Sequence, residues 1–133
     1  MEDIIVEKHA VVNGFDVLVT FNIFGIRCGY VGVPSDNKYY RADTMTIDCE
    51  LNFGVECTYA DFMDYGKFDP NLWYIGFDCG HTYNGFDEQS YRKYFPDRAI
   101  PIHTTLMFGK PETVDDVYST CVQLVQDILE SSK

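Results

Sequence analysis

Hydrophobic and polar positions alternate in the first third of the chain, and the pattern predicts three β-strands. Two apolar clusters over residues 3–12 lead into Asn13-Gly14, the dipeptide that best supplies the positive φ angles of a tight hairpin turn. Residues 15–22 then alternate with a single exception, which is the period of a strand with one buried face. The segment 26–33 continues in β-type residues interrupted by glycine, which favours a bulge or a close approach by another group.

Two more strands are predicted in the middle of the chain. After an exposed polar loop at 35–44, residues 45–51 alternate between apolar and polar side chains and are interpreted as a half-buried strand. Residues 54–60 extend this strand or pair with it, and the mixed aromatic and acidic segment 61–71 suits a connecting loop. The run 73–79 is the most strongly β-prone of the sequence. We interpret it as a central strand with one face formed by Trp73, Ile75, Phe77 and Cys79.

The C-terminal part contains the clearest periodicity. Apolar residues recur there every three or four positions, which predicts an amphipathic helix over about 114–130. Thr113 is placed to cap the helix N-terminus, and Asp116 is placed to return the capping hydrogen bond. Before this helix, residues 80–99 show no period and are expected to form a functional or mobile loop. A short strand or extended piece is expected at 100–108.

These elements predict an α+β fold in which an antiparallel β-sheet, over about 3–108, packs against one C-terminal amphipathic α-helix. At 133 residues the chain has the length of one domain, and such a domain buries roughly two-thirds of the surface that its unfolded chain exposes. No repeat or linker divides the sequence. Residues 1–133 are therefore expected to form a single domain.

Charge and cysteine content narrow the classes of function. Ten Lys and Arg residues against 21 Asp and Glu residues give a formal net charge of −11, which argues against a nucleic acid polymer or an anionic membrane as the partner. Five cysteines at irregular positions suit free thiols in a reducing compartment. The N-terminus lacks the basic and apolar regions of a signal peptide, and the apolar runs are too short to cross a bilayer. We therefore expect a cytoplasmic protein.

Metal and cofactor chemistry has little support in the sequence. The segment FDCGH brings Asp78, Cys79 and His81 to a strand end. Successive side chains of a strand point to opposite faces, so Asp78 and Cys79 cannot both reach one ion without distortion. A structural zinc site also normally shows two ligand pairs. We therefore expect no metal and no cofactor.

A cysteine nucleophile is the catalytic possibility, with Cys28, Cys49 or Cys57 activated by His81 or His103. The sequence shows no third group to orient such a pair, and free cysteines are usually buried and inert. We therefore assign no catalytic residue. A small hydrolase, with one of these histidines as general base, is kept as an alternative.

Two local groups of basic residues lie beside aromatic residues. Arginine can fork onto phosphate oxygens while a neighbouring ring stacks on a base, so each group suits a nucleotide-like ligand. The alternative is a solvated loop whose arginines pair with the abundant acidic residues. The first group comprises Arg27, Lys38, Arg41, Tyr30, Tyr39 and Tyr40, and the second comprises Arg92, Lys93, Arg98, Tyr91, Tyr94 and Phe95.

Three segments, CGYVGVP at 28–34, WYIGFDCGH at 73–81 and VYSTCVQLVQDILE at 117–130, together resemble a family of small proteins encoded by tailed phages and prophages. In that family a His-Gly-Gly-Leu-Thr-Tyr sequence lies between the first two motifs. The matching place here is NFGV at 52–55, with Thr58-Tyr59 after it. The family's histidine is absent, so no role is carried over for it. The resemblance implies a phage origin.

Phages encode small oligomeric proteins that sequester the nucleotide signals of bacterial immunity, including cyclic dinucleotides and ADP-ribose derivatives made by TIR enzymes. By this analogy we expect a homo-oligomer in the host bacterial cytoplasm that captures such a small nucleotide-like molecule without chemistry. Aromatic rings stack on the base, Arg or backbone groups hold phosphates, and Asp78 accepts ribose hydroxyls. An acidic inhibitor that docks on a basic host protein is a further hypothesis. The expected ligand-binding residues are Arg27, Tyr30, Trp73, Phe77, Asp78, His81 and Tyr83.

Overall fold

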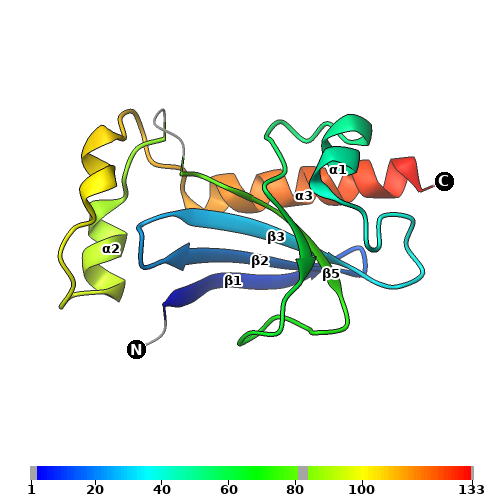
Figure 1. The fold of residues 1–133 in the computed structure, drawn as a ribbon, viewed down its shortest axis with the longest axis horizontal. Helices are drawn as coiled ribbons and strands as arrows, with labels where there is room; N and C mark the ends of the chain where they lie inside the picture. Colours follow the sequence, from blue (N-terminus) through cyan, green and yellow to red (C-terminus); the bar gives the residue numbers. More distant parts are fainter. Residues whose placement is uncertain (1–2, 81–83, 133) are drawn as a thin grey trace.

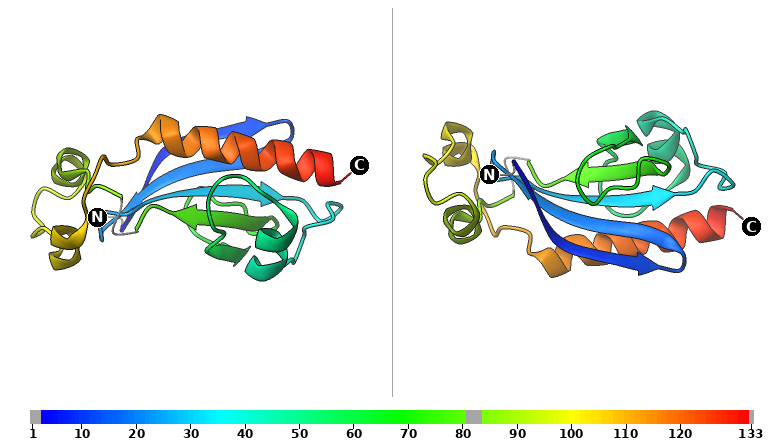
Figure 2. Two further views of the ribbon diagram at one scale, coloured as in Figure 1. Left: turned by 90° about the horizontal axis from the view of Figure 1, so that it is seen from above. Right: turned by 90° about the horizontal axis from the view of Figure 1, so that it is seen from below.

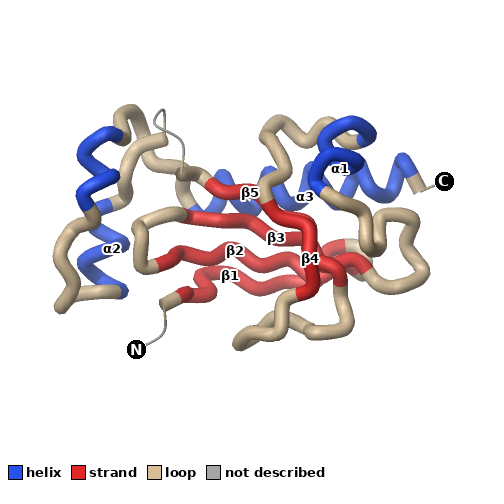
Figure 3. Tube along the Cα trace, in the orientation of Figure 1, coloured by secondary structure: helices blue, strands red, loops and turns tan. Residues whose placement is uncertain are grey.

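The computed structural model describes residues 3–80 and 84–132. Five antiparallel strands form one sheet in the order β1-β2-β3-β5-β4, and helices complete an α+β fold as predicted (Figure 1, Figure 3). Helix α2 stands at one end of the sheet, and α3 ends at the opposite end of the molecule (Figure 1). The strands are β1 (Ile4–Val12), β2 (Phe15–Asn22), β3 (Arg27–Val33), β4 (Tyr59–Phe62) and β5 (Trp73–Asp78).

The N-terminal hairpin forms as the alternation predicts. Asn13 and Gly14 take φ angles of 50° and 85°, which are the left-handed angles of a tight hairpin turn. Between Val6 and Lys8 the pairing of β1 with β2 shifts by one residue. Such a bulge changes the direction of the extra side chain. Here the extra residue is Glu7, whose carboxylate reaches the Arg27 guanidinium on β3.

Helix α3 (Val114–Ser131) packs across one face of β1, β2 and β3 (Figure 2). Thr113 and Asp116 exchange the two hydrogen bonds of a capping box, at 3.0 and 3.1 Å, so the predicted cap is confirmed. Burying an aliphatic side chain contributes roughly 1.5–3 kcal/mol, and the helix is held mainly by this packing. Its buried residues are Val117, Cys121, Leu124, Val125 and Ile128.

The strand predicted at 45–51 is wrong, because this segment forms helix α1 (Thr44–Glu50). Ile47 is fully buried in the core shared with α3, whereas Met45 is 75 % exposed. Ile47 and Leu51 lie four positions apart and are both buried, so the same letters also fit one helical face. Over seven residues, hydrophobic periodicity does not separate the two structures.

Two predictions for the segment before α3 are also wrong. Residues 80–99, expected as a loop, contain helix α2 (Glu88–Tyr94), and residues 100–108, expected as extended, contain the 3-10 helix η1 (Ile102–Leu106). The C-terminal helix is therefore accompanied by shorter ones. Helix α2 forms where aromatic side chains pack on the end of the sheet, and the buried members of that cluster are Phe21, Tyr91 and Phe95.

Strand β5 is an interior strand, and the middle position of the sheet belongs to β3. The expected face of β5 is confirmed, because Ile75 and Phe77 are buried in the α3-side core. The prediction that 54–60 extends or pairs with a strand at 45–51 is wrong, because 45–50 is helical and the last two residues of 54–60 begin β4, which pairs with β5. Within the described ranges, no helix is both long and apolar enough to cross a membrane.

Candidate ligand-binding site

A cavity of about 80 Å³ lies where β5 ends, beside the first turns of α3. Its walls combine apolar side chains with carboxylate, amide and hydroxyl groups. Two of the residues predicted from sequence, Phe77 and Asp78, are among them, and three others come from the loop before α3 and from α3 itself. The lining residues are Val55, Phe77, Asp78, Cys79, Asn84, Glu112, Val117 and Thr120.

The two loops that flank this cavity run side by side. The Gly85 N–H donates to the Lys110 carbonyl at 3.1 Å. A Cβ at position 85 would lie 2.3 Å from the Gly109 carbonyl oxygen, so only glycine permits this approach without a backbone shift. Asn84 directly precedes Gly85, and Glu112 lies two residues after Lys110. The contact therefore brings both residues to the same cavity.

Carboxylates dominate the electrostatics of the cavity and of the shallow depression beside it. The depression is lined by residues of α1 and of the following loop, including Asp48 and Glu56, and it shares Val55 with the cavity. Among residues 3–80 and 84–132, no ion pair within 4.0 Å joins a basic side chain to Asp48, Glu56, Asp78 or Glu112. The site therefore favours groups that donate hydrogen bonds or carry positive charge.

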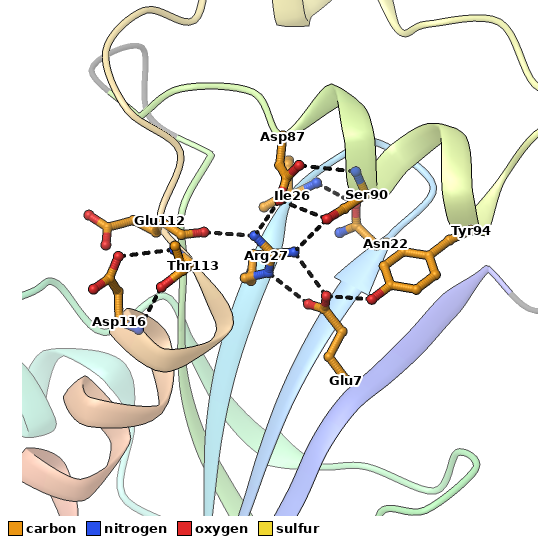
Figure 4. A network of polar contacts seen from close by, with 10 residues as sticks. All are labelled: Glu7, Asn22, Ile26, Arg27, Asp87, Ser90, Tyr94, Glu112, Thr113 and Asp116. Atoms are coloured by element: carbon orange, nitrogen blue, oxygen red, sulfur yellow. Dashed lines mark hydrogen bonds and ion pairs between the residues drawn. The ribbon is translucent and has the colours of Figure 1, made fainter.

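Arg27 does not line the cavity. Its side chain is 4 % exposed and lies within a network of polar contacts (Figure 4). The guanidinium forks onto the Glu7 carboxylate at 2.7 and 2.9 Å, and it donates to Asp87 at 3.2 Å and to the Glu112 carbonyl at 2.7 Å. Burial disfavours the charged form, but the hydrogen bonds and charges of Glu7 and Asp87 outweigh burial and raise the pKa of Arg27. All three guanidinium nitrogens thus bond to protein groups.

Tyr30 and Trp73 make packing contacts away from the cavity. Tyr30 lies on the sheet face opposite α3, in edge contact with the rings of Tyr59 and Phe68. Burial raises the pKa of its hydroxyl. Trp73 donates its indole N–H to the Ala42 carbonyl at 2.9 Å and packs edge-on against a neighbouring phenylalanine ring. Neither ring lines the cavity with Phe77 and Asp78, although the charge of Asp78 acts on the Tyr30 hydroxyl and adds to the rise in its pKa.

The remaining predicted residues divide between the cavity and the undescribed part of the chain. Phe77 is 3 % exposed, and its ring stands against the Phe53 ring at 6.0 Å between centroids. Asp78 is half-buried, and its Oδ1 accepts from the Gly80 N–H at 2.9 Å. His81 and Tyr83 lie outside the described residues.

Four of the six basic residues in the two groups pair with acidic residues, whereas Arg41 and Lys93 lie over aromatic rings. Besides Arg27, an ion pair joins Lys38 to Glu50 at 3.5 Å. In the second group Arg92 pairs with Glu88 at 3.0 Å and Arg98 with Asp3 at 3.6 Å. The buried rings of these groups are Tyr39, Tyr91 and Phe95. For Arg27, Lys38, Arg92 and Arg98, these contacts fit the alternative in which the basic residues pair with acids.

The thiols near the cavity are held in their protonated form. Burial, reinforced by the charge of Glu112, raises the pKa of Cys79 to about 12. Burial also raises the pKa of Cys28 to about 12, and that of Cys57 to about 11. A thiol with such a pKa is almost entirely protonated at neutral pH and is a poor nucleophile. Among the described residues, no group of three His, Cys, Asp or Glu side chains is arranged to hold a metal ion.

Sequence reasoning assigned only Phe77 and Asp78 of the eight lining residues to a binding site. Glu112 directly precedes the predicted cap of α3, and Asn84 follows the FDCGH motif by three positions, so both were close to recognised signals. Their convergence depends on the Gly85 contact, which no local pattern shows. No family model, no curated protein and no solved structure matches this chain.

Proposed function

We propose that this chain is a non-catalytic binding protein that takes the donor-rich, uncharged part of a nucleotide-derived molecule into the cavity at the end of β5. One observation carries the proposal: the acidic residues Asp78 and Glu112 line one cavity together with the apolar residues Phe77 and Val117. A ribose or an amino-substituted base offers hydroxyl or amino donors to carboxylate oxygens and a ring to apolar walls.

The charge of the site decides which part of such a ligand enters. A phosphate placed between Asp78 and Glu112 is repelled, whereas ribose hydroxyls donate to carboxylates. A cavity of about 80 Å³ is smaller than the pockets of roughly 300–1,000 Å³ that enclose whole ligands, so it takes only a small part of such a molecule. The phosphates therefore stay outside this cavity. A second copy of the chain, as the expected homo-oligomer supplies, encloses them.

The state of the thiols supports capture without a cysteine nucleophile. The thiols at and near the cavity are protonated at neutral pH. Together with the resemblance to phage proteins, this supports a phage-encoded role in immune evasion, in which a cyclic nucleotide or an ADP-ribose derivative is withdrawn from its receptor in the host cytoplasm.

The proposal is tested with ADP-ribose and a cyclic dinucleotide as probes. At a hundred times its Kd, a ligand stabilises the fold by about 2.7 kcal/mol, which raises the Tm of a domain of this size by several degrees. Asp78→Asn abolishes the shift, and Asp64→Asn, an exposed residue with the same change of charge, preserves it. Heating the complex releases intact probe. Release of fragments shows the hydrolase instead, and the absence of any shift with both probes contradicts the proposal.

A second candidate is an acidic inhibitor that docks on a basic protein. It is favoured by the net charge of −11 and by the four carboxylates of the cavity and depression that lack ion pairs among the described residues. Such a surface steers positively charged partners toward it.

A hexa-arginine peptide serves as the probe for this candidate. The variant Asp48→Asn/Glu56→Gln/Asp78→Asn/Glu112→Gln is compared with a matched variant that removes four remote charges, Asp36→Asn/Asp61→Asn/Asp64→Asn/Asp97→Asn. Docking at the site predicts that the first variant weakens peptide binding at least about tenfold more than the second, since close charge pairs carry the affinity. Equal weakening shows that net charge alone attracts the peptide.

A further inference from the structure

We propose that Arg27, which does not line the cavity, is the positioning residue that sets the distance between its two walls and couples the cavity to helix α2. Only the expected effect of Arg27 on ligand binding rests on the proposed function; the contacts that position the walls exist without a ligand. Arg27 was expected from sequence to touch the ligand directly, and its contacts give it a different task.

One residue bonds to both cavity walls. The Arg27 guanidinium donates to the main-chain carbonyl of Glu112 at 2.7 Å, and the Arg27 carbonyl accepts from the N–H of Cys79 at 2.9 Å. Glu112 and Cys79 both line the cavity, and they lie 33 positions apart in the sequence. Arg27 thus links the two walls directly, in addition to the contact between the loops at Gly85.

The guanidinium itself is fixed by groups from three other elements, and Figure 4 shows those from β1 and α2. Glu7 of β1 holds two of its nitrogens, and the Glu7 carboxylate also accepts from the Tyr94 hydroxyl of α2 at 2.8 Å. The Phe21 ring of β2 lies 4.9 Å from the centre of the guanidinium. A planar, forked cation held in this way has one orientation, so it can serve as a fixed reference for the cavity.

Helix α2 begins on the same side chain. Asp87 caps α2 by accepting from the Ser90 N–H at 3.0 Å, and its other oxygen accepts from Arg27 at 3.2 Å. The helix start and the loop at Glu112 therefore share one guanidinium nitrogen, Nη1. Any event that pulls α2 away from the sheet loosens the Glu112 wall as well.

Amide hydrogen exchange of Arg27→Lys tests the inference. Lysine keeps the positive charge, but its single ammonium cannot bond at once to Glu7, Asp87 and Glu112. Three amides report on the parts involved: Ser90 on the start of α2, Gly85 on the loop pair, and Asp116 on the start of α3. We expect all three to exchange about tenfold faster or more while amides of β2 keep their rates, because the opening is local.

The matched control is a substitution of another arginine in an ion pair of α2. Arg92→Lys alters an exposed pair within α2 and leaves the three rates unchanged. If Arg27→Lys accelerates Ser90 but not Gly85 and Asp116, Arg27 anchors α2 alone and the inference is wrong. Should Arg27→Lys fail to fold, Glu7→Gln gives the same test, because it weakens the anchor of an intact Arg27.

Ligand measurements separate this inference from the proposed function. If ADP-ribose binds the native protein, Arg27→Lys weakens binding at a temperature where the variant is folded, and Arg92→Lys does not. If ADP-ribose does not bind at all, the proposed ligand fails, and the exchange rates still decide whether Arg27 positions the walls. Unchanged binding by a variant whose three amides exchange faster shows that wall spacing does not control the site and overturns the coupling.

Discussion

Helices α1 and α2 have the same length and the same type of cap, yet they are attached to the sheet by different forces. Each spans seven residues and is preceded by an aspartate, whose carboxylate accepts a hydrogen bond from the backbone N–H three residues later. Helix α1 is attached mainly by Ile47, which is fully buried in the core. Helix α2 is attached by an aromatic cluster and by the Arg27 network. Isolated helices of this length are not stable in water, so the attachment decides whether each exists.

The two kinds of attachment respond differently when a helix moves relative to the sheet, because a buried aliphatic side chain tolerates a small displacement and a forked ion pair does not. Ile47 can shift slightly and stay buried, since the hydrophobic effect has no direction. The bonds of Arg27 are directional, and buried charges left without partners are costly. The cavity lies beside the attachment that is directional. Each of the following experiments weakens one attachment and leaves the other.

The largest effect is expected for Arg27→Met, which leaves the Glu7 carboxylate buried without its cation. Breaking a buried pair from one side costs roughly 3–5 kcal/mol, and the free energy of unfolding in urea measures the loss. Glu7→Leu/Arg27→Met recovers most of the stability, because both charges are gone. A loss below about 1 kcal/mol in Arg27→Met, the value of an exposed ion pair, shows that the Glu7–Arg27 pair does not contribute to stability as a buried pair does.

Ile47→Ala is the matching test of α1. Truncating a buried isoleucine to alanine costs roughly 2–5 kcal/mol, depending on how far the surroundings collapse into the space left behind. Ile47 lies between α1 and the α3-side core, so its truncation leaves a cavity there. The loss is measured by urea unfolding. Hydrogen exchange should accelerate within α1, while Ser90 at the start of α2 keeps its rate relative to global unfolding. Equal acceleration at both helices shows that the two attachments are not independent.

Replacement of the caps gives a smaller effect that differs between the helices. Asp87→Ala removes the cap of α2 and one partner of Arg27, so we expect a loss of about 1–2 kcal/mol. Asp43→Ala removes the cap of α1 alone, whose bond to the Thr46 N–H is exposed, and the loss is smaller. Urea unfolding of both variants gives the comparison. A larger loss for Asp43→Ala reverses the order and contradicts the role given to Arg27.

The smallest effect is expected for the dependence of stability on pH that Asp87 causes. The pKa of Asp87 is lowered because hydrogen bonds from Ser90 and the charge of Arg27 outweigh burial. A carboxyl whose pKa is lower in the folded state stabilises the fold above its unfolded pKa, about 3.9, and this contribution is lost as pH falls through the folded pKa. Stability should therefore decline below about pH 4. Asp87→Asn removes its share of the decline, and an unchanged pH profile in this variant contradicts the assignment.

The candidate site shows how far local patterns reach. Phe77 and Asp78 were found because a strongly β-prone run ends there, and strand ends often line sites. Arg27 was noticed as a rare cation in an acidic chain, but its partners Glu7 and Asp87 lie 20 and 60 positions away. No local pattern indicates that these charges meet. An arginine that positions other groups therefore looks, in sequence, like one that binds a ligand.

The sequence by itself determined the hairpin at Asn13-Gly14, the strand at 73–78 and the capped helix α3, because turn chemistry, β propensity and long periodic patterns act over a few neighbouring residues. Tertiary structure alone decided that Thr44–Glu50 is a helix, that β3 occupies the middle of the sheet, and that Glu112 and Asp78 line one cavity. These outcomes depend on which distant surfaces bury one another. A seven-residue pattern carries too little information to fix that, whereas an 18-residue helix carries enough.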